Sequence, residues 1–325
     1  MGWTRGEILG KGGFAFVSKA KTHQERGHEN RPLPPIIAVK SARVSESKPL
    51  LKEKELLDQF KACPCILRCY GDDHTTENGQ QLYNILLEYA SGGCLADRIT
   101  DKGLPEHVVK HHVKSMLTAL GHIHKMGYVH CDVKPHNVLI VKEGTNQDEV
   151  AKLADFGSAK KSRPTTEEEQ EDGGFRGTVL YAAPESISLQ EYLPESDVWA
   201  LGCTVLHMLT GKAPWKFDKK AQAKDVLFKI GCSNDIPEIP TGKKISEEAK
   251  DFVRKCLVKD PRARWRVDML LDHPFLKMPT VGSRHHHHHL SARFHLMMVL
   301  LFMHYNVDDD KFIMSFCRLK KCILL

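Results

Sequence analysis

The segment His130–Asn137 places an aspartate, a lysine and an asparagine within a few residues of one another, and an apolar run follows it. Asp132 can accept the proton of an incoming hydroxyl group, and Lys134 can neutralise charge that builds up on a phosphoryl group. Asn137 carries an amide oxygen that can coordinate Mg²⁺. A surface loop rarely combines these residues at this spacing ahead of a strand. The segment therefore predicts a phosphoryl-transfer site with Asp132 as catalytic base, Lys134 beside it and Asn137 as a metal ligand.

A second carboxylate, Asp155, follows the apolar run 151–154 and opens the tripeptide Asp155–Gly157. The tripeptide Asp-Phe-Gly is frequent in proteins, so its place after a predicted strand, shortly after Asn137, is what makes it informative. Hard cations prefer oxygen ligands, and an aspartate suits an ion that bridges the β- and γ-phosphates of a nucleotide. Asp155 is therefore the second predicted Mg²⁺ ligand.

A lysine, Lys40, ends the apolar run Ile37–Val39. Such a lysine commonly extends past an apolar surface to solvent. Alternatively, its ammonium group binds the α- and β-phosphates of a nucleotide while a glutamate on a nearby helix holds it in place. Glu53 is the candidate partner, because Leu57 lies one turn later on the same helix face and points to the core, and Glu55 is the alternative.

The segment Leu9–Val17 is rich in glycine. Without side chains at Gly10 and Gly12, backbone N–H groups can lie close to a polyphosphate. An ordinary tight turn explains the same glycines, so this segment is informative only together with the others. Val17 would cover the base of the nucleotide. The residues that we expect to contact the nucleotide here are Leu9, Gly10, Lys11, Gly12, Gly13 and Val17.

The predicted elements change in kind at the glycine pair 92–93. Apolar alternation and short apolar runs before this point predict strands near residues 8–17, 36–39 and 82–89, with one helix over 48–60. Periodic apolar residues after it predict helices over residues 105–123, 197–209, 247–257 and 267–276. We expect an α+β fold with a sheet-rich lobe over 3–88, a hinge over 88–92, a larger helical lobe over 93–277, and a poorly ordered tail over 278–325.

The composition is that of an ordinary globular protein, with 41% hydrophobic and 27% charged residues among 325. The net charge of +6 is not clustered into a stripe, which argues against nucleic-acid binding. No apolar leader segment follows Met1, so we expect the ten cysteines to be free thiols in the cytosol or nucleus. We also expect a monomer.

Taken in order, these segments resemble the eukaryotic protein kinase superfamily over residues 3–277. Ala183–Glu185 looks like the Ala-Pro-Glu motif of that family, and Asp197–Gly202 looks like the start of its buried helix. Arg264 falls where the family pairs an arginine with the motif glutamate, here Glu185. The resemblance implies a bilobal protein kinase fold, with a small antiparallel sheet lobe that carries one main helix, and a larger, mostly helical lobe.

The resemblance also implies ATP and Mg²⁺ as cofactors and a place for the adenine. In the family the hinge backbone binds the base, which carries over to residues Glu88 to Ala90, with Leu87 gating the pocket behind. Ala38 and Leu139 are the further contacts that the resemblance implies.

Lys134 and the pair Gly177–Thr178 resemble serine/threonine kinases rather than tyrosine kinases, which lack that lysine. A short aliphatic hydroxyl must reach Asp132. Thr178 can steady that carboxylate by hydrogen bonding, so we count it among the catalytic residues.

Four segments are similar to the plant mitogen-activated protein kinase kinase kinases of the MEKK-like class. They are Trp3–Gly6, His130–Asp132, Phe156–Lys160 and Asp197–Cys203. This similarity implies a MAP kinase kinase as protein substrate. Two alternatives stay open: a serine/threonine kinase with unrelated targets, and a pseudokinase that acts as a scaffold. Pseudokinases usually lose one of three residues that are all present here, Lys40, Asp132 and Asp155.

Cys131 departs from the family, which has an arginine at this position that pairs with a phosphorylated residue of the activation segment. Cysteine cannot form that ion pair. We therefore hypothesise that the kinase depends less on activation-segment phosphate, or uses a different cation. The acidic run Glu167–Asp172 is either a solvated segment or a built-in mimic of that phosphate.

The tail ends in Cys322 followed by two aliphatic residues and Leu325, with basic residues before it. This end fits a C-a-a-X prenylation box, and an unmodified apolar end is the alternative. Membrane association is expected only if Cys322 is prenylated. The apolar patch Leu296–Phe302 is far shorter than the roughly 20 residues that span a bilayer.

Overall fold

The computed structural model describes residues 2–23, 33–143, 148–162, 174–218, 220–242 and 244–277. The chain divides into two units, Met1–Lys277 and Met278–Leu325, and the second lies outside the described residues. The activation-segment hydroxyls Thr165 and Thr166, the acidic run and the prenylation box also lie outside them.

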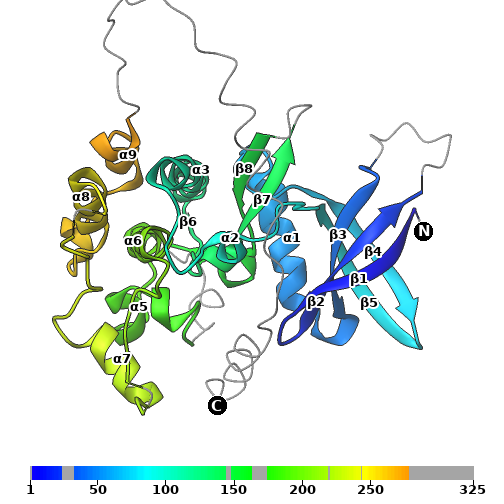
Figure 1. Ribbon diagram of the computed structural model, residues 1–325. Coiled ribbons are helices and arrows are strands. Elements are labelled where there is room, and N and C mark those ends of the chain that lie inside the picture. The colour runs from blue at the N-terminus through cyan, green and yellow to red at the C-terminus, as the bar shows by residue number, and fades with distance from the viewer. Residues whose placement is uncertain are drawn as a thin grey trace, which may run out of the picture. The chain divides into compact units, whose positions relative to one another are not determined.

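A five-stranded antiparallel sheet forms the N-terminal lobe (Figure 1). Its strands are β1 (Trp3–Lys11), β2 (Ala15–Thr22), β3 (Ile36–Arg43), β4 (Cys69–Glu77) and β5 (Gln80–Glu88), in the spatial order β1-β2-β3-β5-β4. The predicted small antiparallel sheet is confirmed. Sequence reasoning missed β4, because this edge strand pairs only with β5 and leaves most of its polar side chains at least partly exposed.

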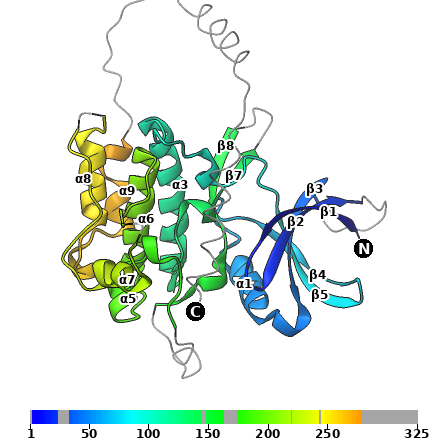
Figure 2. The ribbon, with the colours of Figure 1, turned by 60° about the horizontal axis from the view of Figure 1, so that its bottom comes forward.

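The main helix in the described part of this lobe, α1 (Lys48–Phe60), spans the predicted residues. Pro49 stands in its first turn, where the missing N–H costs nothing. Its buried face carries Leu50, Leu56, Leu57 and Phe60, and a single charged residue lies among them, Glu53. Helix α1 contacts both β4 and the turn Phe156–Ser158, and so it connects the sheet of this lobe with the C-terminal lobe (Figure 2).

The C-terminal lobe is mostly helical, as predicted. Its helices are α2 (Leu95–Arg98), α3 (Glu106–Lys125), α5 (Pro184–Ser188), α6 (Pro194–Thr210), α7 (Ala223–Gly231), α8 (Glu247–Cys256) and α9 (Val267–Leu271). Two short sheets pair β7 (Val138–Glu143) with β8 (Asp148–Leu153), and β6 (Tyr128–Val129) with β9 (Lys160–Lys161).

Helix α6 is the most deeply buried of these elements, as its apolar sequence predicts. It packs between α3 and α8, which lie on either side of it in Figure 2. At Gly202 a Cβ atom would lie 2.5 Å from the Cβ of Cys256, so only glycine allows α6 and α8 to approach this closely.

The predicted helix over 267–276 is wrong in its second half. Helix α9 ends at Leu271, and a separate 3₁₀ turn spans Pro274–Leu276. The break follows from Pro274, which has no N–H to continue the helical hydrogen bonds. Helices α5 and α7 were not predicted, because α5 is one turn long and α7 buries only Ile230.

A buried ion pair ties the segment after the activation loop to the helical lobe. Arg264 Nη1 donates to Glu185 Oε1 at 2.8 Å, and Nη2 donates to Oε2 at 3.2 Å. Arg264 is only 3% exposed, and it also donates to the carbonyl oxygens of Glu195 and Val258. A bidentate pair with its remaining donors satisfied offsets the cost of burying both charges.

No helix of the described residues is long and apolar enough to span a membrane.

A buried histidine on α3 makes stability depend on pH. His112 is 5% exposed, and burial lowers the pKa of its ring to about 4, with the charge of His111 acting in the same direction. Below pH 6.5 the unfolded chain binds a proton that the folded chain accepts only near pH 4, so stability is lost as pH falls through this range. Between pH 7 and pH 5 we expect His112 alone to cost about 2 kcal/mol.

Denaturant unfolding at these two pH values, for the wild type and His112→Leu, measures this effect. The variant should lose less stability on acidification than the wild type does. His107→Leu, an exposed position on the same helix, is the control and should keep the wild-type dependence. Equal pH dependence in wild type and His112→Leu would contradict the prediction.

Candidate active site

Lys40 lies between two carboxylates that come from different parts of the chain. Its Nζ donates to Glu53 Oε2 at 2.6 Å and to Asp155 Oδ1 at 3.0 Å. The structure therefore pairs Lys40 with Glu53, the partner that the sequence favoured, and the alternative Glu55 is exposed. Strand β3, helix α1 and the segment after β8 meet at this one ammonium group.

In this cluster Lys40 and Asp155 stabilise each other's charge, while burial raises the pKa of Glu53. Burial alone would lower the pKa of Lys40, but the charges and hydrogen bonds of Glu53 and Asp155 outweigh it and raise that pKa. Burial works in the opposite sense on Asp155, whose pKa is nevertheless lowered by the charge and hydrogen bond of Lys40. Lys40 is therefore a cation and Asp155 an anion at neutral pH.

Asp132 receives donors from three other predicted residues. Thr178 Oγ1 donates to Asp132 Oδ1 at 2.8 Å, while Lys134 Nζ and Asn137 Nδ2 donate to Oδ2 at 2.7 and 2.9 Å. Lys134 Nζ also donates to Thr178 Oγ1 at 2.6 Å. The carboxylate is thus fixed in direction, as a base that must meet a hydroxyl group requires.

The backbone around this site is strained at two residues that are not glycine. Cys131 and Asp155 have φ angles of 68° and 63°, in the left-handed region. Gly177 has φ 97°, and a Cβ atom there would collide with the carbonyl oxygen of Cys131. Such conformations persist only where the surroundings hold them, and they are common at functional sites.

Asp197 at the start of α6 holds the catalytic segment, a role that sequence reasoning did not assign. Its carboxylate accepts from the backbone N–H of His130 at 2.8 Å and of Cys131 at 3.0 Å, and pairs with the His124 ring at 2.8 Å. The sequence feature that could have indicated this role is an aspartate in the first turn of an otherwise apolar helix, because a buried carboxylate needs hydrogen-bond partners.

Three aromatic rings connect helix α1 with the catalytic segment, and sequence reasoning missed this contact too. Phe156 is fully buried, with its ring centroid 5.3 Å from that of Phe60 on α1 and 4.9 Å from that of His130. No local pattern shows it, because the three residues are far apart in sequence. These ring contacts couple the position of α1, and hence of Glu53, to the segment that carries Asp132.

The residues predicted to surround the adenine belong to one hydrophobic cluster that extends through both lobes. Ala38 and Leu87 are buried in it, and Val17, Ala90 and Leu139 pack against it while partly exposed. The hinge begins at Glu88, whose N–H donates to the Arg68 carbonyl. The carboxylate of Glu88 is held by Lys152, with both N···O distances 3.0 Å.

The glycine-rich turn joins β1 and β2 and is exposed, together with Leu9 and Lys11. A Cβ atom at Gly10 or Gly13 would meet nothing within 4 Å, and neither residue has a positive φ. The protein itself therefore gives no reason for glycine at these two positions. Close approach by a ligand such as a polyphosphate would give one.

Asn137 and Asp155 offer oxygen ligands of the kind that Mg²⁺ prefers. Because Asn137 Nδ2 donates to Asp132, its amide oxygen is left to face another partner. The described residues contain no group of three His, Cys, Asp or Glu side chains placed to hold a metal. This donor set fits an ion that takes its other ligands from nucleotide phosphates and water.

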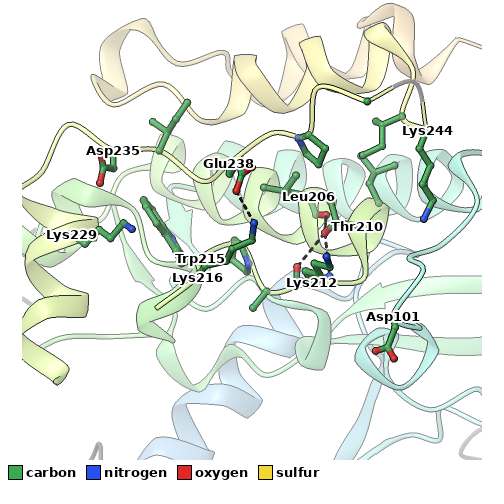
Figure 3. A pocket seen from close by; sticks show the side chains of 17 residues that line it. Asp101, Leu206, Thr210, Lys212, Trp215, Lys216, Lys229, Asp235, Glu238 and Lys244 are labelled. Atoms are coloured by element: carbon green, nitrogen blue, oxygen red, sulfur yellow. Dashed lines mark hydrogen bonds and ion pairs between the residues drawn. The ribbon is translucent and has the colours of Figure 1, made fainter. Parts of the chain in front are cut away.

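A hollow of about 510 Å³ lies apart from these residues at the end of α6 (Figure 3). Leu206, Trp215 and Ile245 are among its apolar lining, and an ion pair between Lys216 and Glu238 at 2.7 Å lies at its edge. None of the predicted site residues lines it.

Comparison with known proteins agrees with this geometry. Residues 3–276 match the protein kinase domain family, and the chain belongs to this family. It is a serine/threonine protein kinase, as predicted.

Curated relatives narrow the comparison. The chain is 42% identical over 318 residues to mitogen-activated protein kinase kinase kinase 20 of Arabidopsis thaliana, covering 97% of this chain and 86% of the relative. It is 39% identical to mitogen-activated protein kinase kinase kinase 17 of the same plant, over 85% of this chain and 70% of that relative. It is 38% identical to mitogen-activated protein kinase kinase kinase 18, over 85% of this chain and 78% of that relative. The predicted resemblance to this plant class is confirmed.

The hydroxyl of Thr178 generates a prediction about catalysis. Thr178→Val keeps the shape of the side chain but removes a donor to Asp132 and an acceptor for Lys134. We expect kcat to fall roughly 10- to 100-fold. Thr178→Ser restores the hydroxyl and should recover most of the rate in a steady-state kinase assay. Thr118→Val, which removes an exposed hydroxyl on α3, is the control. A Thr178→Val enzyme with wild-type kcat would exclude the role.

Proposed function

We propose that this protein is a MAP kinase kinase kinase that transfers the γ-phosphate of ATP to serine or threonine hydroxyls of a MAP kinase kinase. The observation that carries the chemistry is the convergence on Asp132 of Thr178, Lys134 and Asn137, with donor distances between 2.7 and 2.9 Å. In the same structure, Lys40 forms its ion pair with Glu53.

Each lobe contributes a distinct part of nucleotide binding. Val17, Ala38 and Leu139 supply apolar contacts for the adenine, and the hinge backbone from Glu88 supplies its hydrogen bonds. Lys40 binds the α- and β-phosphates, because its ammonium group is held at fixed position by two carboxylates. The glycine-rich turn would contact the phosphates through N–H groups other than that of Gly12, which donates to the carbonyl oxygen of Ala15.

Transfer depends mainly on position and charge. Asp132 accepts the proton of the acceptor hydroxyl, and Thr178 keeps its carboxylate in line. Lys134 lies 2.7 Å from Asp132 and neutralises charge on the transferred group. Bound at Asn137 and Asp155, Mg²⁺ would supply further charge neutralisation on the β- and γ-phosphates.

The assignment to a cascade rests on the relatives. All three named Arabidopsis proteins are called mitogen-activated protein kinase kinase kinases, and the first is aligned over nearly the whole chain. A pseudokinase scaffold is disfavoured, because Lys40, Asp132 and Asp155 are present and paired as catalysis requires. A serine/threonine kinase with other targets remains the second candidate.

Phosphorylation of a purified MAP kinase kinase tests the proposal. The substrate should carry an inactivating change of its own strand lysine, so that incorporated phosphate comes only from this enzyme. Wild type should label the activation segment, and replacing the acceptor hydroxyls of that segment by alanine should abolish labelling. Labelling of general peptides but not of the MAP kinase kinase would instead favour other targets.

The role of Asp132 is tested in the same assay. Asp132→Asn should lower kcat about 10²- to 10⁴-fold, because the positioned base is lost while the fold is kept. Lys40→Met should also abolish activity through the lost phosphate contact. Asp272→Asn, at an exposed position after α9, is the control and should match wild type. An Asp132→Asn enzyme as active as wild type would refute the assignment.

Regulation is proposed to depend less on activation-segment phosphate than in kinases with an arginine before the base. Burial and the charge of Asp197 raise the pKa of Cys131, so its thiol is neutral. Alanine at Ser162, Thr165 and Thr166 together should leave most of the activity intact in the peptide assay. Loss of activity with alanine, and its return with aspartate, would show that the phosphate is required.

Location in the cytosol or nucleus, a monomeric state and prenylation at Cys322 stay predictions.

A further inference from the structure

Arg5 in β1 connects all five strands of the N-terminal sheet through its guanidinium group. Nε and Nη2 donate to the Glu77 carboxylate on β4 at 2.9–3.1 Å, and Nη2 also donates to Asn84 Oδ1 on β5 at 3.0 Å. Nη1 donates to Ser18 Oγ on β2 at 2.7 Å and to Ser41 Oγ on β3 at 3.0 Å. All five N–H donors that arginine offers are thus engaged.

Three of the four side chains that accept from Arg5 are buried, and two of these three are bonded to each other. Ser18, Ser41 and Asn84 are fully buried. Ser41 Oγ donates to Asn84 Oδ1 at 2.6 Å, and Asn84 Nδ2 donates to Thr75 Oγ1 at 3.0 Å. A polar network of this kind has a defined geometry only while each member keeps its partners. Loss of Arg5 would therefore leave several buried acceptors unsatisfied at once.

Two aromatic rings complete the environment of the guanidinium group. Its Cζ lies 5.1 Å from the ring centroid of Trp3 and 5.1 Å from that of Phe16. Phe16 pairs with Lys11 at the last step of the β1–β2 ladder before the glycine-rich turn. Through Phe16, Arg5 therefore contacts the part of β2 that directly follows the glycine-rich turn.

The network lies directly behind residues that the nucleotide site uses. Ser18 follows Val17 in β2, and Ser41 follows Lys40 in β3. Successive side chains of a strand point to opposite faces of a sheet. Arg5 thus binds β2 and β3 on one face of the sheet, through the residues that directly follow Val17 and Lys40. Val17 and Lys40 themselves point to the opposite face.

Main-chain pairing specifies the two sides of the turn unequally. On the β2 side, the β2–β3 ladder is regular from Ala15 to Lys21 and places Val17 opposite Lys40. The β1–β2 ladder has register irregularities between Arg5 and Ile8 and between Ile8 and Gly10. Irregular pairing bends a strand and weakens its register. These two steps lie between Arg5 and the glycine-rich turn, so it is the β1 side of the turn that an additional tie to β2 and β3 would fix relative to Lys40.

We propose that Arg5 is a positioning residue that sets the glycine-rich turn of β1–β2 at its distance from Lys40 on β3, and so determines affinity for ATP. It does so through Ser18 on one strand and Ser41 on the other. The contact with Glu77 anchors the arginine to β4, away from the turn. This role rests on the proposed function, because its readout is nucleotide binding.

Lysine cannot replace arginine here, because a single ammonium group cannot reach four strands with a rigid fork of donors. Arg5→Lys should raise the KM for ATP roughly 10-fold, since two charge-assisted hydrogen bonds to β2 and β3 are lost or weakened. The kcat at saturating ATP and the KM for the protein substrate should change far less. Ser18→Ala, which removes one tie and keeps Arg5, should raise the KM for ATP in the same direction.

Glu77→Gln is the matched control, because it weakens the same network at the strand that does not touch the turn. It should lower the unfolding midpoint, as Arg5→Lys does, while the KM for ATP stays near the wild-type value. Assays should run at a temperature where circular dichroism shows each variant folded. Should Arg5→Lys fold poorly, Ser18→Ala carries the same comparison.

Two results would overturn the positioning role. One is a wild-type KM for ATP in folded Arg5→Lys and Ser18→Ala. The other is a KM that rises equally in Glu77→Gln, in proportion to lost stability, which would make the network structural only. Calorimetric binding of ATP to the wild type separates this question from the proposed function, because a wild type that binds no ATP would refute the function itself.

Discussion

The ammonium group of Lys40 is the point on which the arrangement of the site depends. Two carboxylates, Glu53 and Asp155, would repel each other if no cation lay between them, and Glu53 is buried on a helix face that is otherwise apolar. The buried charge is stable only while its partner is present. The ion pair therefore determines where helix α1 stands, and with it the distance between the two lobes at the nucleotide.

A second constraint acts on the backbone of the helical lobe. Cys131 and Asp155 adopt left-handed conformations that cost free energy. Asp197 offsets part of this cost by accepting from two consecutive backbone N–H groups, and Phe156 fills the space between His130 and α1. The buried helix α6 thus acts as a rigid support for the catalytic segment, which is why an acidic residue is found at its start.

Much of the fold could be read from local patterns. Helix α1 has its predicted bounds, because its apolar face and early proline agree with one another. Elements without an apolar period were missed, as for β4, whose place is set by pairing with β5. Helix α9 is shorter than predicted. The apolar periodicity continues past Pro274, but the helical hydrogen bonds cannot, because proline has no N–H.

The sequence by itself determined the chemistry, because aspartate, lysine and asparagine at fixed spacing suit few reactions other than phosphoryl transfer. Only the tertiary structure decided which groups meet. It brought Lys40 to Glu53, the partner that the sequence favoured over Glu55, and it joined the five strands through Arg5. Such contacts link residues far apart in the chain, and their energies depend on burial and direction, which no local pattern contains.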